Sequence, residues 1–250
     1  APDGDVICSV ENPYKATGGL RVLGGNLSPE FSAVLKLAGV EGGLENNVFL
    51  GKARVFDAEA NLLHTLENSP EVFEHHDMVI VRYEGPSGAP GMPEMLDSTS
   101  RITTLCREKG IIVGLMTDAR FSGGSVGLVI GHVGPEAALG GPIAFVEDGD
   151  EIVVDLNVNE LNCTALLDSA TLDTRKAAWE KTVAANGGMH PAVGNVDTRL
   201  LNRMRRTAVS AIFGAGMHPD RVLWVPQSRA PVKTAFVPSN KYRAGSERAF

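Results

Sequence analysis

An aspartate, an arginine and a serine stand close together in a glycine-rich stretch of this sequence, directly after a short apolar run. The apolar run covers residues 111–116, and Asp118, Arg120 and Ser122 follow it, with two glycines at 123–124. A carboxylate, a guanidinium and a hydroxyl supply charge, hydrogen bonds and a possible base, while glycines let a ligand approach the backbone. No ordinary core requires this combination, so the stretch predicts a binding or catalytic site.

A second apolar run, residues 78–83, has the same design, because it opens into a loop of glycine and proline that starts at Glu84. Between the two runs, apolar residues recur at three- and four-residue spacing over 93–109. This spacing predicts a helix, which Gly110 closes. Strand, helix and strand in this length predict a βαβ unit with two parallel strands.

The two loops should leave the same edge of the sheet, since the carboxyl ends of parallel strands lie together and ligands of open α/β sheets bind there. Glu84 would then face the polar residues of the second loop. The alternative is purely structural. Asp118 would cap a turn, Glu84 would be a solvated carboxylate at a helix start, and the two glycines would only allow positive φ. Two polar loops at one edge favour the site.

The remaining pattern predicts a mixed sheet followed by helices. Residues 48–56 are expected to form a strand, and residues 143–156 a hairpin that turns at the Asp-Gly of 147–150. Three more helices are expected: one from an Asp57 cap through Leu66, one over 174–185 capped by Asp173, and one over 198–213 capped by Asp197.

The composition is that of a soluble globular chain. Its 250 residues are 43% hydrophobic, and no stretch approaches the roughly eighteen consecutive apolar residues of a membrane helix. The N-terminus lacks a basic start and an apolar signal core, so we expect a cytoplasmic protein. The net charge is −7. The basic residues Arg199, Arg203, Arg205 and Arg206 lack interleaved aromatics and are expected on a solvated or intersubunit face, not on nucleic acid.

Cysteine and histidine are placed without a metal-binding pattern. Cys8, Cys106 and Cys163 are odd in number, far apart and outside any Cys-x-x-Cys spacing. This favours a reducing compartment, and the three cannot alone supply four ligands to an iron–sulfur cluster. Gly-Met-His-Pro occurs twice, at His190 and His218, but each copy follows an expected helix and is interpreted as an ordinary helix stop.

Four glycine-containing motifs follow one another in order. They are Thr-Gly-Gly-Leu-Arg-Val-Leu-Gly-Gly-Asn at 17–26, Tyr-Glu-Gly-Pro at 83–86 running to Pro-Gly-Met-Pro-Glu-Met at 90–95, Thr-Asp-Ala-Arg-Phe-Ser-Gly-Gly at 117–124, and Gly-His-Val-Gly-Pro-Glu-Ala at 131–137 with Gly-Gly-Pro-Ile at 140–143. Together they resemble the C-terminal part of the dihydroxy-acid dehydratase and 6-phosphogluconate dehydratase family, which also contains sugar-acid dehydratases. The resemblance covers roughly residues 17–156.

The resemblance implies a hydro-lyase that removes water from a 2,3-dihydroxy acid or a sugar acid to give a 2-keto acid. It implies that Ser122 is the base that takes the C2 proton and that Glu84 is a magnesium ligand. The expected substrate-binding residues are Arg120, Gly123, Gly124 and Ser125, with Asp118 and His132 as further candidates.

The resemblance also implies Mg²⁺ and an iron–sulfur cluster as cofactors, with the cluster ligands in an N-terminal domain that this chain lacks. The implied fold is mixed α/β and β-rich: a swivelling β/β/α-type domain with a barrel-like sheet, a βαβ unit and C-terminal helices. We expect residues 1–20 to be an interdomain connection, 21–165 the swivelling domain, and 166–250 a helical, proline-interrupted extension of it. The expected partners are the small acid, the missing domain and further copies in a homo-oligomer.

One position departs from the family pattern. Ala119 stands where family members commonly have glycine, so a backbone conformation that depends on glycine is not expected there. A different class of function also stays open. The chain could be a stand-alone binding or interaction module whose glycine-rich loops cradle an anion without chemistry.

Overall fold

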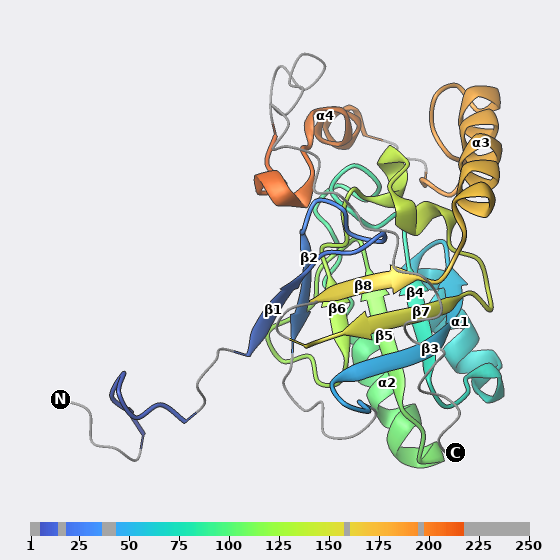
Figure 1. The fold of residues 1–250 in the computed structure, drawn as a ribbon. Coiled ribbons are helices and arrows are strands. Elements are labelled where there is room, and N and C mark those ends of the chain that lie inside the picture. The colour runs from blue at the N-terminus through green and yellow to red at the C-terminus, as the bar shows by residue number, and fades with distance from the viewer. Residues whose placement is uncertain (1–5, 15–18, 37–43, 158–160, 195–197, 218–250) are drawn as a thin grey trace.

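A computed structural model of the protein describes residues 6–14, 19–36, 44–157, 161–194 and 198–217. Within them, eight strands form one sheet in the order β1-β2-β6-β5-β4-β3-β7-β8, with helices around it (Figure 1). The strands are β1 (Leu20–Leu23), β2 (Ala33–Lys36), β3 (Val48–Phe56), β4 (Asp77–Val81), β5 (Val113–Thr117), β6 (Val129–Gly131), β7 (Glu151–Asp155) and β8 (Asn162–Ala165). The α-helices are α1 (Glu59–Asn68), α2 (Leu96–Lys109), α3 (Ser169–Ala185) and α4 (Arg199–Thr207), and the 3-10 helices are η1 (Pro70–Val72), η2 (Ala137–Leu139), η3 (Pro142–Phe145) and η4 (Ala211–Phe213).

The sheet curls into a nearly closed barrel. Its four central strands, β3 to β6, are parallel to their neighbours within that group, and the outer pairings are antiparallel. The two ends of the strand order come together just after β1, where Gly24 N donates to Leu161 O and Cys163 N donates to Gly24 O, both at 2.9 Å. The expected fold class, mixed α/β with a barrel-like sheet and C-terminal helices, is therefore confirmed.

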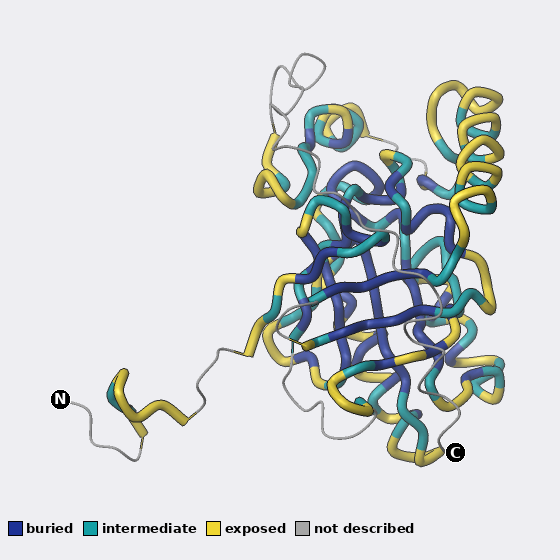
Figure 2. The backbone as a smooth tube through the Cα atoms, in the orientation of Figure 1, coloured by how far each residue is buried: buried dark blue, intermediate teal, exposed yellow. Residues whose placement is uncertain are grey.

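The expected βαβ unit is present as β4, α2 and β5, and β4 pairs with β5 in parallel. Every residue of both strands is buried, because each strand has apolar neighbours on both faces (Figure 2). Met78 and Ile80 point into the barrel core, whereas Val79 and Val81 belong to a second cluster formed with α1 and α2. Gly110 ends α2 with φ +66°, as the sequence predicts.

The strand expected over 48–56 is confirmed as β3, but the start of the next helix differs from the prediction. Asp57 does not cap α1, whose N-cap is Ala58 without a side-chain hydrogen bond. The Asp57 carboxylate instead accepts a hydrogen bond from Arg82 Nε at 2.6 Å. The ion pair takes the aspartate away from the helix because a guanidinium is a stronger partner than a backbone N–H.

The hairpin expected over 143–156 is wrong in its first half. Residues Pro142–Phe145 form η3, and the Asp-Gly turn leads from that 3-10 helix into β7. Pro142 stands at the first turn of this helix, where its missing N–H costs little and its fixed φ suits the helical conformation. β7 pairs with β3 on one side and with β8 on the other, so the true hairpin joins β7 and β8.

The last two helices keep their expected places but not their expected bounds. α3 begins at Ser169, where Asp168 caps it by accepting from Thr171 N at 2.7 Å, so Asp173 is not the cap. α4 is capped by the Thr198 hydroxyl, which accepts from Leu201 N at 3.2 Å; Asp197 lies outside the described residues. α4 also stops at Thr207, short of residue 213, because the chain is extended at the next residue.

α3 projects from the barrel and buries none of its residues fully (Figure 2). Two side chains nevertheless fasten it. Arg175 forms ion pairs with Asp150 and Glu147, at 2.5 Å and 3.2 Å, and Trp179 packs edge-on against Phe145. A helix that is polar on nearly every side depends on such anchors, since it has no apolar stripe to bury.

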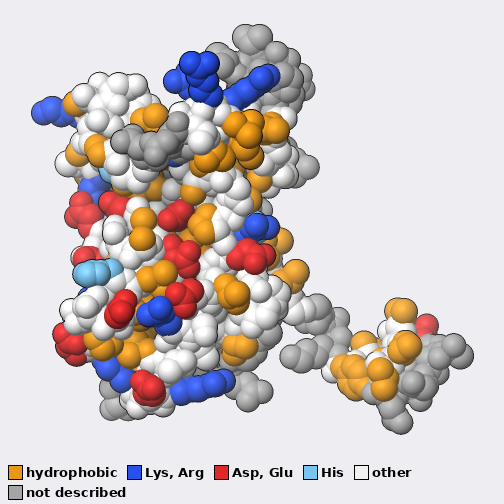
Figure 3. Space-filling model, turned by 180° about the vertical axis from the view of Figure 1, so that it is seen from behind, with side chains coloured by type: hydrophobic (Ala, Val, Ile, Leu, Met, Phe, Trp, Pro, Cys, Tyr) orange, Lys and Arg blue, Asp and Glu red, His pale blue; other side chains and the backbone are white. Residues whose placement is uncertain are grey.

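The charged side chains are distributed unevenly over the surface. On the face seen in Figure 3, acidic side chains gather over the middle, while Lys and Arg lie mostly toward the two ends. Among the described residues, no helix is both long enough and apolar enough to cross a bilayer.

Candidate active site

Two loops leave the carboxyl-terminal ends of the paired strands β4 and β5. We call residues 82–95 the β4 loop and residues 118–128 the β5 loop. The last residues of the two strands, Val81 and Thr117, are direct partners in the ladder, so both loops start side by side. This register confirms the expectation that both loops leave the same edge of the sheet.

Asp118, the first residue of the β5 loop, holds the start of the β4 loop. Its carboxylate accepts hydrogen bonds from Tyr83 N (3.1 Å), Glu84 N (3.0 Å) and Ala137 N (2.9 Å), and the residue is 1% exposed. Burial, together with the nearby charge of Glu136, raises the pKa of Asp118 to about 7. Asp118 is thus a link between three chain segments and not the cap of a single turn.

Glu136 does the same for the next part of the β4 loop. Its carboxylate accepts from Ser87 N and Gly88 N at 2.9 to 3.0 Å, and the residue is 2% exposed. A Cβ on Gly85 would lie 2.5 Å from a Glu136 oxygen, so only glycine fits between the loop and this carboxylate. The sequence placed Glu136 in a motif but assigned it no role.

Glu84 projects from this fixed backbone and is half-buried. Its Oε1 accepts from Glu59 N, the first residue of α1, at 3.0 Å. Burial raises the pKa of Glu84, as do the charges of Asp118 and Glu59, and the Glu59 N–H partly offsets them. Among the described residues Oε2 has no hydrogen-bond partner, so one carboxylate oxygen is available to a ligand.

Glu84 lines a cavity of about 490 Å³ between the β4 loop and the segment that ends in α4. Arg205 lines it from the opposite side, where its Nη2 donates to Gly88 O at 3.1 Å and to Gly194 O at 2.8 Å. The side chain is only 7% exposed. The expectation of a solvated or intersubunit face is therefore wrong for Arg205, whereas Arg199, Arg203 and Arg206 are exposed.

Tyr83 forms the aromatic wall of this site and has φ +66°, a left-handed conformation that is costly for a tyrosine. The His190 ring stacks on it at 4.7 Å, and Trp179 Nε1 of α3 donates to its hydroxyl at 3.1 Å. Burial raises the pKa of Tyr83 to about 12. His190 thus packs against an aromatic ring, in keeping with its interpretation as a structural residue, while His218 lies outside the described residues.

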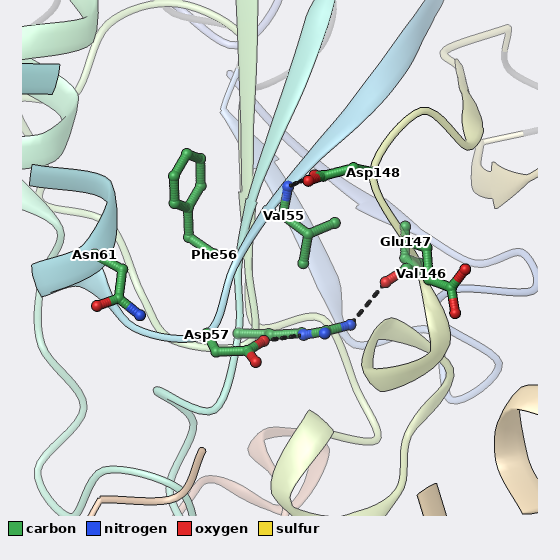
Figure 4. A pocket seen from close by; sticks show the side chains of 8 residues that line it. Val55, Phe56, Asp57, Asn61, Val146, Glu147 and Asp148 are labelled. Carbon is green, nitrogen blue, oxygen red and sulfur yellow. Dashed lines mark hydrogen bonds and ion pairs between the residues drawn. The ribbon is translucent and has the colours of Figure 1, made fainter. Parts of the chain in front are cut away.

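Arg82 fixes the other flank of the β4 loop. Its guanidinium bonds Asp57 and donates to the carbonyls of Ala144 and Val146, both at 2.8 Å. The dashed lines in Figure 4 trace this bridge from Asp57 to Val146 beside a second cavity, of about 430 Å³. Arg82 is one polar residue in an apolar run, and that interruption was the only sequence signal of its role.

The β5 loop is far more open. Gly123 and Gly124 are exposed, and Ser122 is half-buried, with its Oγ accepting from Gly124 N at 3.3 Å. Neither glycine has positive φ, and a Cβ on either would meet nothing within 4 Å. The structural explanation for these glycines is therefore wrong, because neither backbone conformation nor space requires them. Ser125 Oγ is buried and has no hydrogen-bond partner among the described residues.

Two contacts show where the β5 loop runs. Arg120 Nε donates to Met92 O at 3.0 Å, which ties the β5 loop to the end of the β4 loop. Lys36, which pairs with the first residue of β6, donates from Nζ to Ser122 O and Gly123 O, both at 2.7 Å. Ser122 thus lies where the loop turns back toward the start of β6, and it is not among the residues that line the Glu84 cavity.

His132 and Ala119 meet at the base of the β5 loop. His132 N donates to Ala119 O at 2.8 Å, and burial and the charge of Arg120 lower the pKa of the imidazole. His132 has φ +56°, so it shares the strained left-handed conformation of Tyr83. Ala119 is fully buried without positive φ, so alanine fits where the family pattern has glycine.

Metal-binding side chains are sparse in the part of the chain that the structure describes. No three His, Cys, Asp or Glu gather there closely enough to hold an ion. Cys163 is buried in β8, where its Sγ contacts Gly24 O, and Cys106 lies on α2. These cysteines do not fit an iron–sulfur cluster, whereas the single carboxylate of Glu84 fits one position of a hard cation such as Mg²⁺.

A family model described as dihydroxy-acid/6-phosphogluconate dehydratase C-terminal matches residues 5–215, which include both loops and α4. The chain belongs to this family. Among its curated relatives, the dihydroxy-acid dehydratase of Mycobacterium sp. (strain JLS) is 47% identical over 179 residues, 72% of this chain and 29% of that protein. The dihydroxy-acid dehydratase of Clostridium beijerinckii is 48% identical over 176 residues, 70% of this chain and 30% of that protein.

A more distant relative extends the match. The dihydroxy-acid dehydratase of Ignicoccus hospitalis is 40% identical over 215 residues, 86% of this chain and 36% of that protein. The chain thus spans about a third of the length of the dehydratases it matches. The family resemblance drawn from the four motifs is confirmed.

Proposed function

We propose that this chain is the C-terminal part of a dehydratase that converts 2,3-dihydroxy acids or sugar acids to 2-keto acids. The observation that carries the proposal is the pair Gly123 and Gly124. Neither has a positive φ, and the space around each missing side chain is open, so folding does not explain them. Next to these glycines lie Ser122 and the buried hydroxyl of Ser125, which has no hydrogen-bond partner among the described residues. Glycines that folding does not require, in such surroundings, suit a loop that a ligand approaches closely.

In the proposed reaction Ser122 is the base. As an alkoxide it takes the C2 proton; the C2–H electron pair forms a C2–C3 double bond, and the C3–O bond breaks. The departing hydroxide receives the proton back from Ser122 and leaves as water, which restores the alkoxide. The enol that remains then tautomerises to the 2-keto acid.

Substrate binding would involve both loops. We assign it to Arg120, Gly123, Gly124 and Ser125 on the β5 loop, with Asp118 and His132 as positioning residues. The cavity between Glu84 and Arg205 adds a candidate that the sequence missed. A buried guanidinium is well suited to a carboxylate group, so Arg205 is the group we expect to attract an acid to this cavity.

Glu84 is the residue of this chain that would hold Mg²⁺. When bound, the ion would act as a Lewis acid on an oxygen of the substrate. A cation would also offset the burial and repulsion that raise the pKa of Glu84. One carboxylate leaves the remaining ligands, and every cluster ligand, to the part of the dehydratase that this chain does not span. We propose that the active site is shared with that part, in a cytoplasmic homo-oligomer.

The test compares the full-length dehydratase with the 250-residue chain. The full-length protein, loaded with iron, sulfide and Mg²⁺, should form a 2-keto acid from a 2,3-dihydroxy acid or a sugar acid. The chain alone should form none under the same conditions. If the full-length protein gave no keto acid from any of these acids, while the chain bound inorganic phosphate or a carboxylate tightly, the chain would be a binding module instead.

A further inference from the structure

Lys36 is the one side chain outside the β5 loop that bonds the backbone of Ser122 in the part of the chain that the structure describes. It ends β2, and its ammonium donates to the carbonyls of Ser122 and Gly123 at 2.7 Å each. Both distances are short for N–H to O bonds, as expected when the donor is charged. Two successive carbonyls turned to one ammonium fix the orientation of the peptide between them.

That orientation decides how the hydroxyl of Ser122 is presented. With both carbonyls held by Lys36, Gly124 N is left to donate to Ser122 Oγ and Ser125 N to donate to Ser122 O. The ammonium is held 2.7 Å from the carbonyl oxygen of the same serine, so it places a positive charge near the hydroxyl. A nearby positive charge stabilises an alkoxide, which is the form a serine needs in order to act as a base.

We propose that Lys36 is a positioning residue for Ser122, and that it both fixes the β5 loop and stabilises the serine alkoxide electrostatically. The inference rests on the dehydratase function proposed above. The other charged and titratable groups at this loop are Asp118 and Arg120 within it and His132 beside it. Asp118 bonds the β4 loop and Arg120 bonds Met92 O, so neither of these two side chains holds the carbonyls of the β5 loop as Lys36 does.

The chain supplies a matched control in Lys109. Its ammonium also donates to two backbone carbonyls, those of Pro70 at 2.8 Å and Phe73 at 3.3 Å. These contacts lie beyond the end of α2, at the opposite edge of the sheet from the start of the β5 loop. Removing either lysine therefore costs similar contacts, but only Lys36 touches the proposed base.

The experiment is steady-state kinetics of the full-length dehydratase with three variants. Lys36→Met should lower kcat about 10- to 100-fold and change KM less than about threefold, since the loop acts on the chemical step. Lys36→Arg, which keeps the charge, should restore at least about a third of kcat. Lys109→Met should leave kcat unchanged. If Lys36→Met does not fold, Lys36→Gln takes its place, with the same expected direction.

Amide hydrogen exchange provides a readout that does not depend on activity. In Lys36→Met, exchange at Gly124 N and Ser125 N should become about tenfold faster, because both amides bond Ser122. Lys109→Met should leave both rates unchanged. A wild-type kcat in Lys36→Met, or equal losses in the Lys36 and Lys109 variants, overturns the inference. If the full-length wild type forms no 2-keto acid, the proposed function fails. If Ser122→Ala is active, the assignment of Ser122 as the base fails and the role of Lys36 with it; if Ser122→Ala is inactive and Lys36→Met is fully active, only the role of Lys36 fails.

Discussion

The two loops that begin side by side after β4 and β5 are built in opposite ways. The β4 loop is largely buried, and two carboxylates, Asp118 and Glu136, bind its backbone N–H groups. The β5 loop is buried at its two ends but open in its middle, where Gly123 and Gly124 are exposed, and an ammonium, that of Lys36, binds its carbonyls. The β4 loop thus holds Glu84 in a preformed position, whereas the β5 loop presents Ser122 on a segment with few contacts.

This difference has a physical cause. Buried N–H groups must be paired, so the β4 loop needs acceptors with fixed positions, and buried carboxylates on other segments supply them. A carboxylate that belongs to a neighbouring segment also prevents that segment from moving alone. The middle of the β5 loop is solvated, so its backbone needs fewer partners there and retains freedom to adjust to a ligand.

The largest effect expected from this comparison is on stability, in Asp118→Ala. Removal of the carboxylate leaves three N–H groups without their acceptor in a site that is 1% exposed. We expect the free energy of unfolding to fall by about 4 kcal/mol. Ser122→Ala removes a hydroxyl that bonds only the β5 loop itself, so it serves as the control and should change this free energy by less than about 0.5 kcal/mol. Urea unfolding followed by circular dichroism measures both, and equal losses would remove the contrast between the loops.

Glycine substitutions sharpen the same comparison with a smaller effect. A Cβ on Gly88 would lie 2.2 Å from Tyr83 O, a backbone atom that cannot move aside cheaply. Gly88→Ala should therefore cost about 3 kcal/mol of unfolding free energy. Gly124→Ala should cost almost nothing in stability, since nothing lies within 4 Å, yet should weaken turnover of the full-length enzyme. A Gly124→Ala enzyme with unchanged kcat and KM would contradict close approach of the substrate.

The smallest expected effect, taken over a single pH unit, is a dependence of stability on pH. Burial raises the pKa of Asp118 from 3.8 to about 7, so between these values the native chain keeps a proton that the unfolded chain releases. The free energy of unfolding should thus fall as pH rises from about 4 to 7, by at most about 1.4 kcal/mol per pH unit. Asp118→Asn should lack this slope. Urea unfolding of both proteins across this range tests it, and parallel curves would contradict the shift.

The strands and helices around the site could be predicted from the sequence, and so could the position of the site at the carboxyl ends of β4 and β5. β3 and the β4-α2-β5 unit follow from apolar runs, helical spacing and the stop at Gly110. These are local signals, and packing reinforces each of them. The pairing of strands then brings Glu84 and Asp118 together, so their proximity follows from the rule for parallel sheets.

The rest depends on contacts between distant residues, which no local pattern encodes. Asp57 is of a residue type that commonly caps helices, yet its carboxylate bonds Arg82. Arg205 lies among other arginines in the sequence, as a surface residue would, yet it is buried against the β4 loop. Lys36 and Glu136 lie 86 and 49 residues from the loop residues that they bond. The course of the β5 loop toward β6 was missed for the same reason.

The most direct test of the account is the turnover of Ser122→Ala in the full-length dehydratase. The variant should fold and bind the substrate normally, but kcat should fall at least about a hundredfold, because general-base catalysis usually contributes that much. A variant that keeps more than about a tenth of the wild-type kcat would attribute less than about 1.4 kcal/mol of the barrier to the hydroxyl. That result would contradict Ser122 as the base and make His132 the next residue to test.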